Sequence, residues 1–164
     1  MSWFCKKMKS PVGELTLIAT EKALVAVLWE NELRNHFRFN PLTEDHQHPI
    51  LLEAERQLGE YFSGQRQCFS LPLAFEGTAF QQKVWQALVS IPFGETRSYA
   101  QIAQQIGHPK AMRAVGAANG KNPISIIAPC HRVIGANGKL TGFAGGLDNK
   151  ALLLGLESRE RQEE

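Results

Sequence analysis

The stretch IAPCHRVIG, residues 127–135, places a cysteine and a histidine side by side inside an otherwise apolar run. Pro129 fixes its own φ at about −65° and biases Ala128 toward extended geometry, so we expect the segment to present Cys130 rigidly. The apolar residues on both sides predict that most of the segment is buried. A thiol beside an imidazole is a candidate nucleophile, because the thiolate is the reactive form and its pKa depends on its neighbours.

Cys130 and His131 also have a plainer interpretation. Free cysteines are among the most buried residue types and are usually inert. In an extended segment, neighbouring side chains point to opposite faces. His131 would therefore reach the Cys130 sulfur only through a bridging water, or if the chain turned at this point. The rest of the chain has to decide between a reactive and an inert cysteine.

The composition indicates an intracellular globular protein. The chain has 164 residues, 43% of them hydrophobic, which is enough for one large or two small domains. We find no apolar run long enough for a membrane helix and no secretory signal, and we expect a cytoplasmic location. The three cysteines contain no C-x-x-C pair, which argues against disulfides and zinc. The histidines at 36, 46 and 48 lie in a polar stretch that we interpret as a solvated loop, so we expect no metal.

Charge is distributed unevenly along the chain. Residues 1–75 carry eight basic and nine acidic side chains, whereas residues 77–150 carry eight basic and two acidic ones. The basic segment also contains the candidate nucleophile. This combination predicts a polyanionic partner such as nucleic acid.

Residues 1–75 have the pattern of a small α+β domain without visible chemistry. Residues 11–20 alternate like a half-buried strand, and residues 23–29 are apolar on both faces like a more central strand, joined to the first by a short turn. Residues 49–64 have apolar side chains at three- and four-residue spacing, which predicts a helix. Residues 69–75 alternate around Pro72 and are expected to form an edge strand or an extended connector. We expect this domain to give structural support.

A second domain is expected over residues 76–157, with a charged tail at 158–164. Thr78 is placed to cap a helix with one apolar stripe. Residues 98–101 have a capping-box pattern that begins a second short helix, and Gly107 ends it before a third helix begins at Lys110. Two short helices joined by a tight turn form a helix-turn-helix, whose second helix usually lies against DNA.

The helix expected at residues 110–119 is rich in alanine and glycine. Gly116 inside a helix costs about 0.5–1 kcal/mol relative to alanine, so its small size should allow close approach to another backbone, either protein or nucleic acid. Arg113 stands among these small residues, and such a helix would read few bases. The pattern fits shallow docking in the minor groove, with one side chain wedged into the base stack.

The remaining segments surround the nucleophile. Residues 124–127 are expected to form a strand leading to Cys130, and residues 136–139 an Asn-Gly hairpin turn. The glycine-dense loop at 141–146 is placed to cover a pocket. The last helix is expected over residues 147–156, ending at Glu157 before a frayed tail.

Together these residues resemble the O6-alkylguanine-DNA alkyltransferases, also called methylated-DNA–protein-cysteine methyltransferases. The sequence PCHRV at 129–133 is similar to the active-site signature of that family. Tyr99, Arg113, Asn122 and Glu157 stand at matching positions around it. The resemblance is dense from about residue 78 to residue 157. It implies an α+β fold: a small N-terminal ribonuclease-H-like α/β domain, followed by a helical winged helix-turn-helix domain.

The resemblance implies a role for each residue near the nucleophile. Cys130 would accept the alkyl group, and His131 would act as a base toward the thiol through a water molecule. Glu157 would orient His131 and stabilise its charge, as in other activated nucleophiles. Asn122 would brace the active-site turn. Tyr99 would assist base flipping and donate a proton or hydrogen bond toward guanine N3.

The resemblance also implies how DNA and the damaged base are held. Arg113 would replace the extruded nucleotide in the stack, while Ala111, Ala114 and Gly116 would let the helix enter the minor groove with low sequence specificity. The carbonyls of Cys130 and Val133 would accept hydrogen bonds from the guanine amino group. The other expected pocket residues are Ala144, whose N–H would lie near O6, and Gly145.

The implied reaction is an in-line displacement on a flipped-out base. The thiolate attacks the alkyl carbon on O6 of guanine, and O4-alkylthymine is a possible further substrate. The product is a thioether, so we expect one turnover per molecule, no cofactor and a monomeric protein. Two alternatives remain. A cysteine hydrolase would need an oxyanion hole and would leave the helix-turn-helix unexplained. A DNA-binding regulator with an inert buried cysteine would leave the Cys-His pair unexplained.

Overall fold

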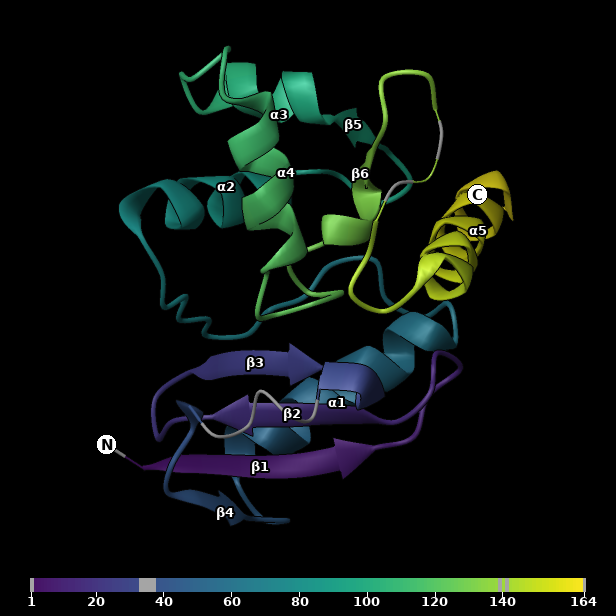
Figure 1. Cartoon of the computed structure of the whole chain (residues 1–164). Coiled ribbons are helices and arrows are strands. Elements are labelled where there is room, and N and C mark those ends of the chain that lie inside the picture. Colours follow the sequence, from purple (N-terminus) through teal and green to yellow (C-terminus); the bar gives the residue numbers. More distant parts are fainter. Residues whose placement is uncertain (1, 33–37, 139, 141, 164) are drawn as a thin grey trace. The chain divides into compact units, whose positions relative to one another are not determined.

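The structure is a computed structural model that describes residues 2–32, 38–138, 140 and 142–163, with side chains described up to residue 158. The chain forms two compact units, Met1–Ala74 and Phe75–Glu164 (Figure 1). Within the described residues, no helix is long and apolar enough to cross a membrane.

The first unit contains a four-stranded sheet in the order β3-β2-β1-β4. The strands are β1 (Trp3–Met8), β2 (Leu15–Ala19), β3 (Leu24–Leu28) and β4 (Leu42–Glu44). β1 pairs antiparallel with β2, β2 pairs antiparallel with β3, and β4 pairs parallel with β1. The expected pair of strands with a short connection corresponds to β2 and β3. The sequence did not predict β1 or β4.

β2 is buried on both faces, so the prediction of a half-buried strand was wrong. Ile18 on one face packs in a cluster with Phe39, and Trp3 packs against the same cluster. Leu15 and Leu17 alternate with Ile18, so they lie on the opposite face. The prediction was wrong because Phe39 and Trp3 cover the face of β2 that carries Ile18, and these two residues are distant from β2 in the sequence.

Helix α1 (Pro49–Phe62) lies against β1, β2 and β3 (Figure 1). The predicted helix is confirmed. His48 caps it: its Nδ1 accepts a hydrogen bond from the Ile50 N–H at 3.2 Å. Residues 69–75 form the connector rather than the edge strand, because they pair with β3 at a single residue. Leu24 donates its N–H to the Pro72 carbonyl at 2.8 Å and accepts from the Ala74 N–H at 3.0 Å.

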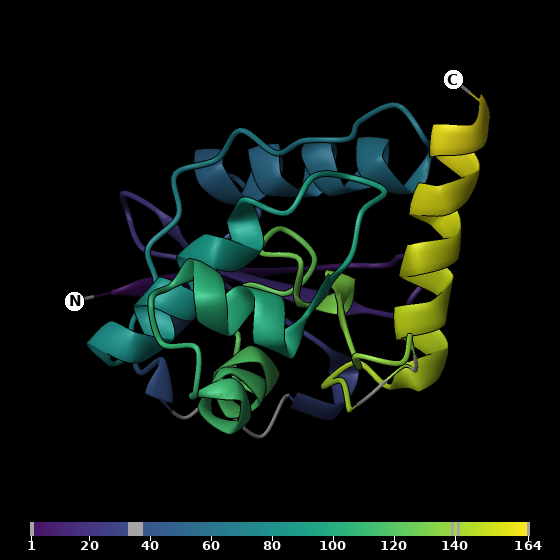
Figure 2. The ribbon, with the colours of Figure 1, turned by 90° about the horizontal axis from the view of Figure 1, so that it is seen from above.

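The second unit is built on three short helices: α2 (Ala79–Val89), α3 (Tyr99–Gln105) and α4 (Met112–Gly120). Figures 1 and 2 both show them grouped together. The predicted Thr78 cap of α2 and the predicted capping box at Ser98 of α3 are confirmed, and Thr78 also forms a capping box with Gln81. Gly107, at φ +81°, lies in the turn between α3 and α4, which completes the expected helix-turn-helix. The third helix begins at Met112 and not at Lys110. The shared core comprises residues of all three helices and of the nucleophile segment: Val84, Trp85, Leu88, Ile102, Val115, Cys130 and Val133.

The segment leading to Cys130 does not form the expected strand. The Ala128 N–H donates to the Ile124 carbonyl at 2.9 Å, which closes a tight turn. A 3₁₀ turn, η2 (Cys130–Arg132), follows directly, and β6 (Val133–Ile134) then pairs in parallel with β5 (Arg97–Ser98). The strand expected at residues 124–127 was therefore wrong, and the chain turns at Cys130, one of the two alternatives that the sequence left open. The physical reason is that the Asn122 side chain takes up backbone hydrogen bonds that a sheet would otherwise use.

The Asn-Gly turn and the last helix differ from what the sequence predicted. A turn does form at the Asn-Gly sequence, where the Gly138 N–H donates to the Gly135 carbonyl at 2.9 Å. Its incoming strand β6 pairs with β5, however, and Lys139 lies outside the described residues. Helix α5 (Leu147–Glu163) continues past Glu157, where the sequence predicted an end. Glutamate, arginine and glutamine are good helix formers, so a charged sequence is compatible with helix here.

Candidate functional site

Asn122 holds the turn that carries Cys130. Its Nδ2 donates to the Ala128 carbonyl at 2.8 Å, and its Oδ1 accepts from the Ile124 N–H at 3.0 Å. Both ends of the turn are thus tied to one buried amide group. Cys130 follows at once, with its own N–H donating to the Ala128 carbonyl at 2.8 Å. The thiol residue is 3% exposed and belongs to the apolar core of the unit.

The same turn contains a strained backbone. Ile126 has a φ of +73°, a left-handed conformation that β-branched residues rarely adopt, and its side chain is buried. Such a conformation costs roughly 1–3 kcal/mol and persists only where the surroundings impose it. Here the Asn122 hydrogen bonds on either side impose it. The three isoleucines at 124, 126 and 127 are typical of a strand, so nothing in the sequence signals this geometry.

The 3₁₀ turn brings His131 and Arg132 onto one carboxylate. A 3₁₀ helix has three residues per turn, so adjacent side chains are not confined to opposite faces as they are in a strand. His131 Nε2 lies 2.6 Å from Glu157 Oε2. Arg132 donates from Nε to Oε1 at 2.8 Å and from Nη2 to Oε2 at 3.0 Å. All three side chains are buried. The predicted His131–Glu157 contact is present, whereas the part played by Arg132 was missed.

The charges of His131, Arg132 and Glu157 determine which nitrogen of His131 can accept a proton. Burial raises the pKa of Glu157, but its hydrogen bonds and charge interactions with His131 and Arg132 outweigh burial and lower the pKa to about 2. Burial lowers the pKa of His131, against the opposing pull of Glu157. A neutral imidazole facing a carboxylate carries its proton on the nitrogen that faces it, here Nε2. Nδ1 is then an acceptor, and it has no hydrogen-bonding partner among the described residues.

Lys150 is a second buried cation that the sequence did not single out. It is fully buried on α5, and its Nζ donates to the Val133 carbonyl at 2.7 Å and lies 5.8 Å from the centre of the Phe143 ring. Burial lowers its pKa, while the charge of the Cys130 thiolate opposes that effect. One lone pair of the Val133 carbonyl, an expected acceptor for the base, is therefore already engaged.

Asn119 was also missed, and it touches the nucleophile's backbone. It lies on the buried face of α4 and is 4% exposed. Its Nδ2 donates to the Cys130 carbonyl at 3.4 Å. Its Oδ1 has no partner among the described residues. A polar residue directly after Ala118 and one helical turn after Val115, both buried, was the available signal in the sequence.

The residues expected to contact DNA lie on the exposed side of α4. Arg113 and Ala114 are exposed, and Ala111 and Gly116 are partly so. A Cβ added at Gly116 would meet the Tyr99 ring at 3.8 Å, an ordinary contact. Packing within the protein therefore does not require glycine at this position. That observation argues against tight helix packing as the reason for the glycine.

The other predicted pocket residues lie in the loop before α5. Ala144 and Gly145 are partly exposed, and the Gly145 carbonyl accepts from Asn149 Nδ2 at 2.8 Å. Tyr99 is the first residue of α3 and packs partly against the core that contains Cys130 and Val133. The structure thus brings Tyr99, Cys130 and Val133 to one cluster. It ties the glycine loop to the helix that carries Lys150.

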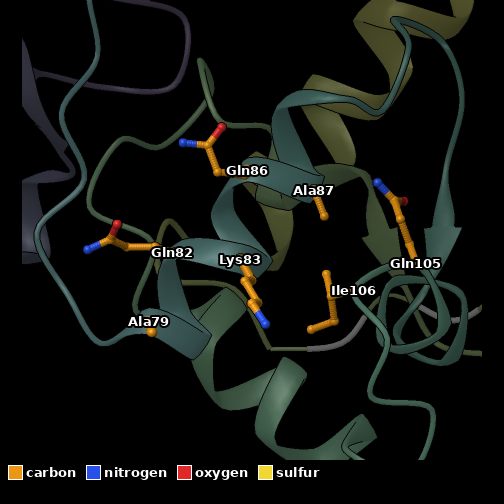
Figure 3. A pocket seen from close by; sticks show the side chains of 7 residues that line it. All are labelled: Ala79, Gln82, Lys83, Gln86, Ala87, Gln105 and Ile106. Atoms are coloured by element: carbon orange, nitrogen blue, oxygen red, sulfur yellow. The ribbon is translucent and has the colours of Figure 1, made fainter.

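An open hollow of about 480 Å³ lies elsewhere in the second unit. Figure 3 shows its lining from α2 and the end of α3, which includes Lys83, Gln86 and Gln105. None of the predicted site residues contributes to this lining. In the described part of the chain, no three His, Cys, Asp or Glu side chains come together in a way that would hold a metal ion.

Comparisons with known proteins agree with this arrangement. The model of the 6-O-methylguanine DNA methyltransferase ribonuclease-like domain matches residues 3–75, and that of the DNA binding domain of the same family matches residues 79–159. These matches confirm the predicted fold class.

Relatives and solved structures match nearly the whole chain. A methylated-DNA–protein-cysteine methyltransferase of Methanosarcina acetivorans is 51% identical over 91% of this chain and 94% of its own length. The constitutive protein of that name from Bacillus subtilis is 48% identical over 91% of this chain and 92% of its own length. A crystal structure of Mycobacterium tuberculosis OGT in complex with DNA has a TM-score of 0.87 and 46% identity, covering 98% of this chain and 94% of that one.

Proposed function

The chain belongs to the 6-O-methylguanine DNA methyltransferase family, and on that premise we propose that Cys130 is the residue that takes the alkyl group. DNA repair by alkyl transfer is its function, it is a methylated-DNA–protein-cysteine methyltransferase, and DNA is its partner. The proposal concerns which side chains perform each step and how the DNA is held.

The observation that carries the proposal concerns His131, the residue after Cys130: its buried Nδ1 has no hydrogen-bonding partner among the described residues. Glu157 holds the Nε2 proton, so Nδ1 is free to accept the thiol proton through a bridging water. The resulting imidazolium faces an ionised carboxylate, which stabilises it. The buried Lys150 adds a positive charge that favours the thiolate.

The transfer step follows from this thiolate. The sulfur attacks the alkyl carbon, an S–C bond forms, and the C–O6 bond breaks with its electron pair going to guanine. The thiol proton passes to His131, and its later return to the base or to Tyr99 balances the proton that neutral guanine gains. Tyr99 donates a proton or a hydrogen bond toward N3 of the departing guanine, because an anionic purine is a poor leaving group. The product is guanine and an S-alkylcysteine at position 130.

The thioether explains why the protein acts once. A C–S bond is not hydrolysed by any acid–base pair, so one molecule removes one alkyl group. An in-line displacement needs no electron sink and no Lewis acid, and we propose that the chain works without a cofactor. The monomeric state, the cytoplasmic location and the domain limits 1–75, 76–157 and 158–164 remain predictions. Acceptance of O4-alkylthymine is a prediction of the same kind.

DNA access requires that the damaged base leave the stack. Flipping costs a few kcal/mol, and we propose that Arg113 offsets part of that cost by filling the vacated space. Ala111, Ala114 and Gly116 would let α4 approach the minor groove closely. This assignment is supported by the space at Gly116. An alanine Cβ would fit there within the protein, so the protein's own packing does not require glycine. Docking of this kind reads few bases, so sequence specificity should be low.

Mass spectrometry tests the proposal directly. The protein is incubated with excess duplex DNA carrying one O6-methylguanine, and the intact mass is followed over time. We expect the mass to rise by one methyl group in place of one hydrogen, on the peptide that contains Cys130, and then to stay constant. Cys130→Ser should take up no methyl group, whereas the matched control Cys68→Ser, at an exposed thiol, should react like the wild type. Repeated turnover would favour a cysteine hydrolase, and no uptake would favour a DNA-binding regulator with an inert cysteine.

A further inference from the structure

Arg132 is a buried cation that the proposed mechanism leaves without a role. It is 5% exposed, and its guanidinium is held from three sides. Nε and Nη2 donate to the two oxygens of Glu157 at 2.8 and 3.0 Å. Nη1 donates to the Ile91 carbonyl at 2.6 Å, and the group lies 5.7 Å from the centre of the Phe93 ring. A charge is costly to bury, so an arginine held this firmly against one carboxylate calls for an explanation.

Arg132 and His131 share the carboxylate of Glu157. Oε2 lies 2.6 Å from His131 Nε2 and also accepts from Arg132 Nη2, whereas Oε1 accepts from Arg132 Nε. The arginine thus engages both oxygens and the histidine only one. A carboxylate that faces a histidine alone favours the protonated imidazolium. A guanidinium keeps its charge at any physiological pH, so Arg132 offsets that pull permanently.

The charges around His131 disfavour a second proton on its ring. Among the described residues, these charges come from Glu157 and Lys150 on α5 and from Arg132 on η2. Cys130, the preceding residue, is the titratable group that would exchange a proton with the ring. Burial is the largest cause that lowers the pKa of His131, and the charges of Arg132 and Lys150 lower it further, against Glu157. One negative and two positive charges leave an excess of one positive charge, and without Arg132 that excess would vanish.

We propose that Arg132 is a positioning residue for the proton transfer: it balances the charge of Glu157 so that His131 stays neutral, with its proton on Nε2 and with Nδ1 as the acceptor. This inference rests on the proposed function of Cys130. His131 can take the thiol proton only while Nδ1 is unprotonated. The same positive charge makes the imidazolium, once formed, a stronger acid, which favours the return of the proton to the departing base. In this role Arg132 acts through Glu157 and His131.

Nuclear magnetic resonance of the His131 ring tests this charge balance. Protein labelled at the ring nitrogens is titrated in a Cys130→Ser background, which removes the titration of the thiol. The His131 signals are identified by their loss in His131→Gln, and they distinguish the two neutral tautomers from the imidazolium. With Arg132 present, we expect a neutral ring protonated on Nε2 at pH 7. Arg132→Gln can still donate to Glu157 but has no charge, so its His131 should take up the second proton at a pH higher by about one unit or more.

Further variants separate the charge of Arg132 from its bracing contacts. Arg132→Lys keeps a positive charge with fewer hydrogen bonds and should shift the titration less than Arg132→Gln does. The matched control Arg56→Gln removes an arginine that donates to Glu53 from the same two nitrogens at an exposed site, and it should leave His131 unchanged. An unchanged His131 titration in Arg132→Gln would show bracing alone and would overturn the inference. An imidazolium at pH 7 in the Cys130→Ser protein would overturn it too, even if no Arg132 variant folds.

The rate of methyl transfer should respond to the same charge. Removing a fixed positive charge makes each proton of the Cys130–His131 pair harder to lose, so the acid limb of the rate profile moves to higher pH. We expect the ratio of the rate at pH 6 to that at pH 8 to fall by up to about tenfold in Arg132→Gln relative to wild type. An equal loss at both pH values would contradict the assignment. Absence of methylation of Cys130 in the wild type would refute the proposed function, whereas the His131 titration tests Arg132 whether or not transfer occurs.

Discussion

The Arg132–Glu157 contact allows a quantitative test of how the site is held together. Glu157 is 1% exposed and accepts two hydrogen bonds from the Arg132 guanidinium and one from His131. We consider three variants: Arg132→Met, Glu157→Gln and the double variant. Methionine and glutamine approximate the size of the residues that they replace, so loss of charge and hydrogen bonding dominates the effect.

The pKa of Glu157 sets the expected magnitude. A pKa lowered from 4.5 to about 2 corresponds to about 3 kcal/mol of folding free energy. Because the folded pKa lies below the unfolded one, this stabilisation is fully present above about pH 5 and is lost as the pH falls toward 2. At pH 7 each single variant leaves a buried charge without its partner, which costs about 3–5 kcal/mol. The double variant removes both charges and should lose about 1–3 kcal/mol less than the sum of the two single losses, because His131 accounts for part of the pKa shift.

Urea unfolding at pH 7 measures this coupling. The four proteins form a double-mutant cycle, and additivity within about 0.5 kcal/mol would refute the reasoning. The matched control is the Arg56–Glu53 pair on α1, with an N–O distance of 2.7 Å but with both side chains largely exposed. The pKa of Glu53 is also lowered to about 2, through its hydrogen bond to Arg56. Solvent screens this pair, so the cycle Arg56→Met and Glu53→Gln should show no coupling above error.

Two further predictions concern DNA and the thiol. Arg113→Ala should slow repair of duplex O6-methylguanine by about tenfold or more, because the flipped base loses its replacement in the stack, yet it should react normally with a free O6-alkylguanine base. Equal losses on both substrates would remove the flipping role. Lys150→Met should slow alkylation of Cys130 by iodoacetamide at pH 7 by about threefold to tenfold, because a buried positive charge that favours the thiolate is gone. Lys150→Arg is the control that keeps the charge, and an unchanged rate in Lys150→Met would show that the ammonium does not influence the sulfur.

Local chemistry explains which elements the sequence predicts well. Thr78 with Gln81, and Ser98 with Gln101, form capping boxes because each pair lies within one helical turn and needs no distant partner. The apolar spacing in α1 similarly identifies its buried face. The contact between His131 and Glu157 spans 26 residues, and only the family resemblance suggested it.

Distant partners explain the elements that the sequence does not predict. β1 has the sequence WFCKKM, whose adjacent lysines break the alternation expected of a strand. The structure accommodates Lys6 because its Nζ pairs with Glu55 of α1 at 3.1 Å. The segment at 124–127 shows the opposite case: its isoleucines are typical of a strand that the structure does not form. The Asn122 side chain takes up the hydrogen bonds at both ends of that segment and forces a turn.

The departures from local preference in the second unit gather around one sulfur. Ile126 has a left-handed backbone, Asn119 and His131 each have a buried acceptor without a partner among the described residues, and Lys150 is a fully buried ammonium. Each feature lowers stability when considered alone, and a sequence selected only for folding would avoid all of them. Cys130 lies in the same apolar core as residues of α4, which carries Asn119, and Lys150 donates to the carbonyl of Val133 in that core. The strained backbone, the buried acceptors and the buried charge therefore serve one requirement. The Cys130 thiol must be ionised and held in position before the alkylated base binds.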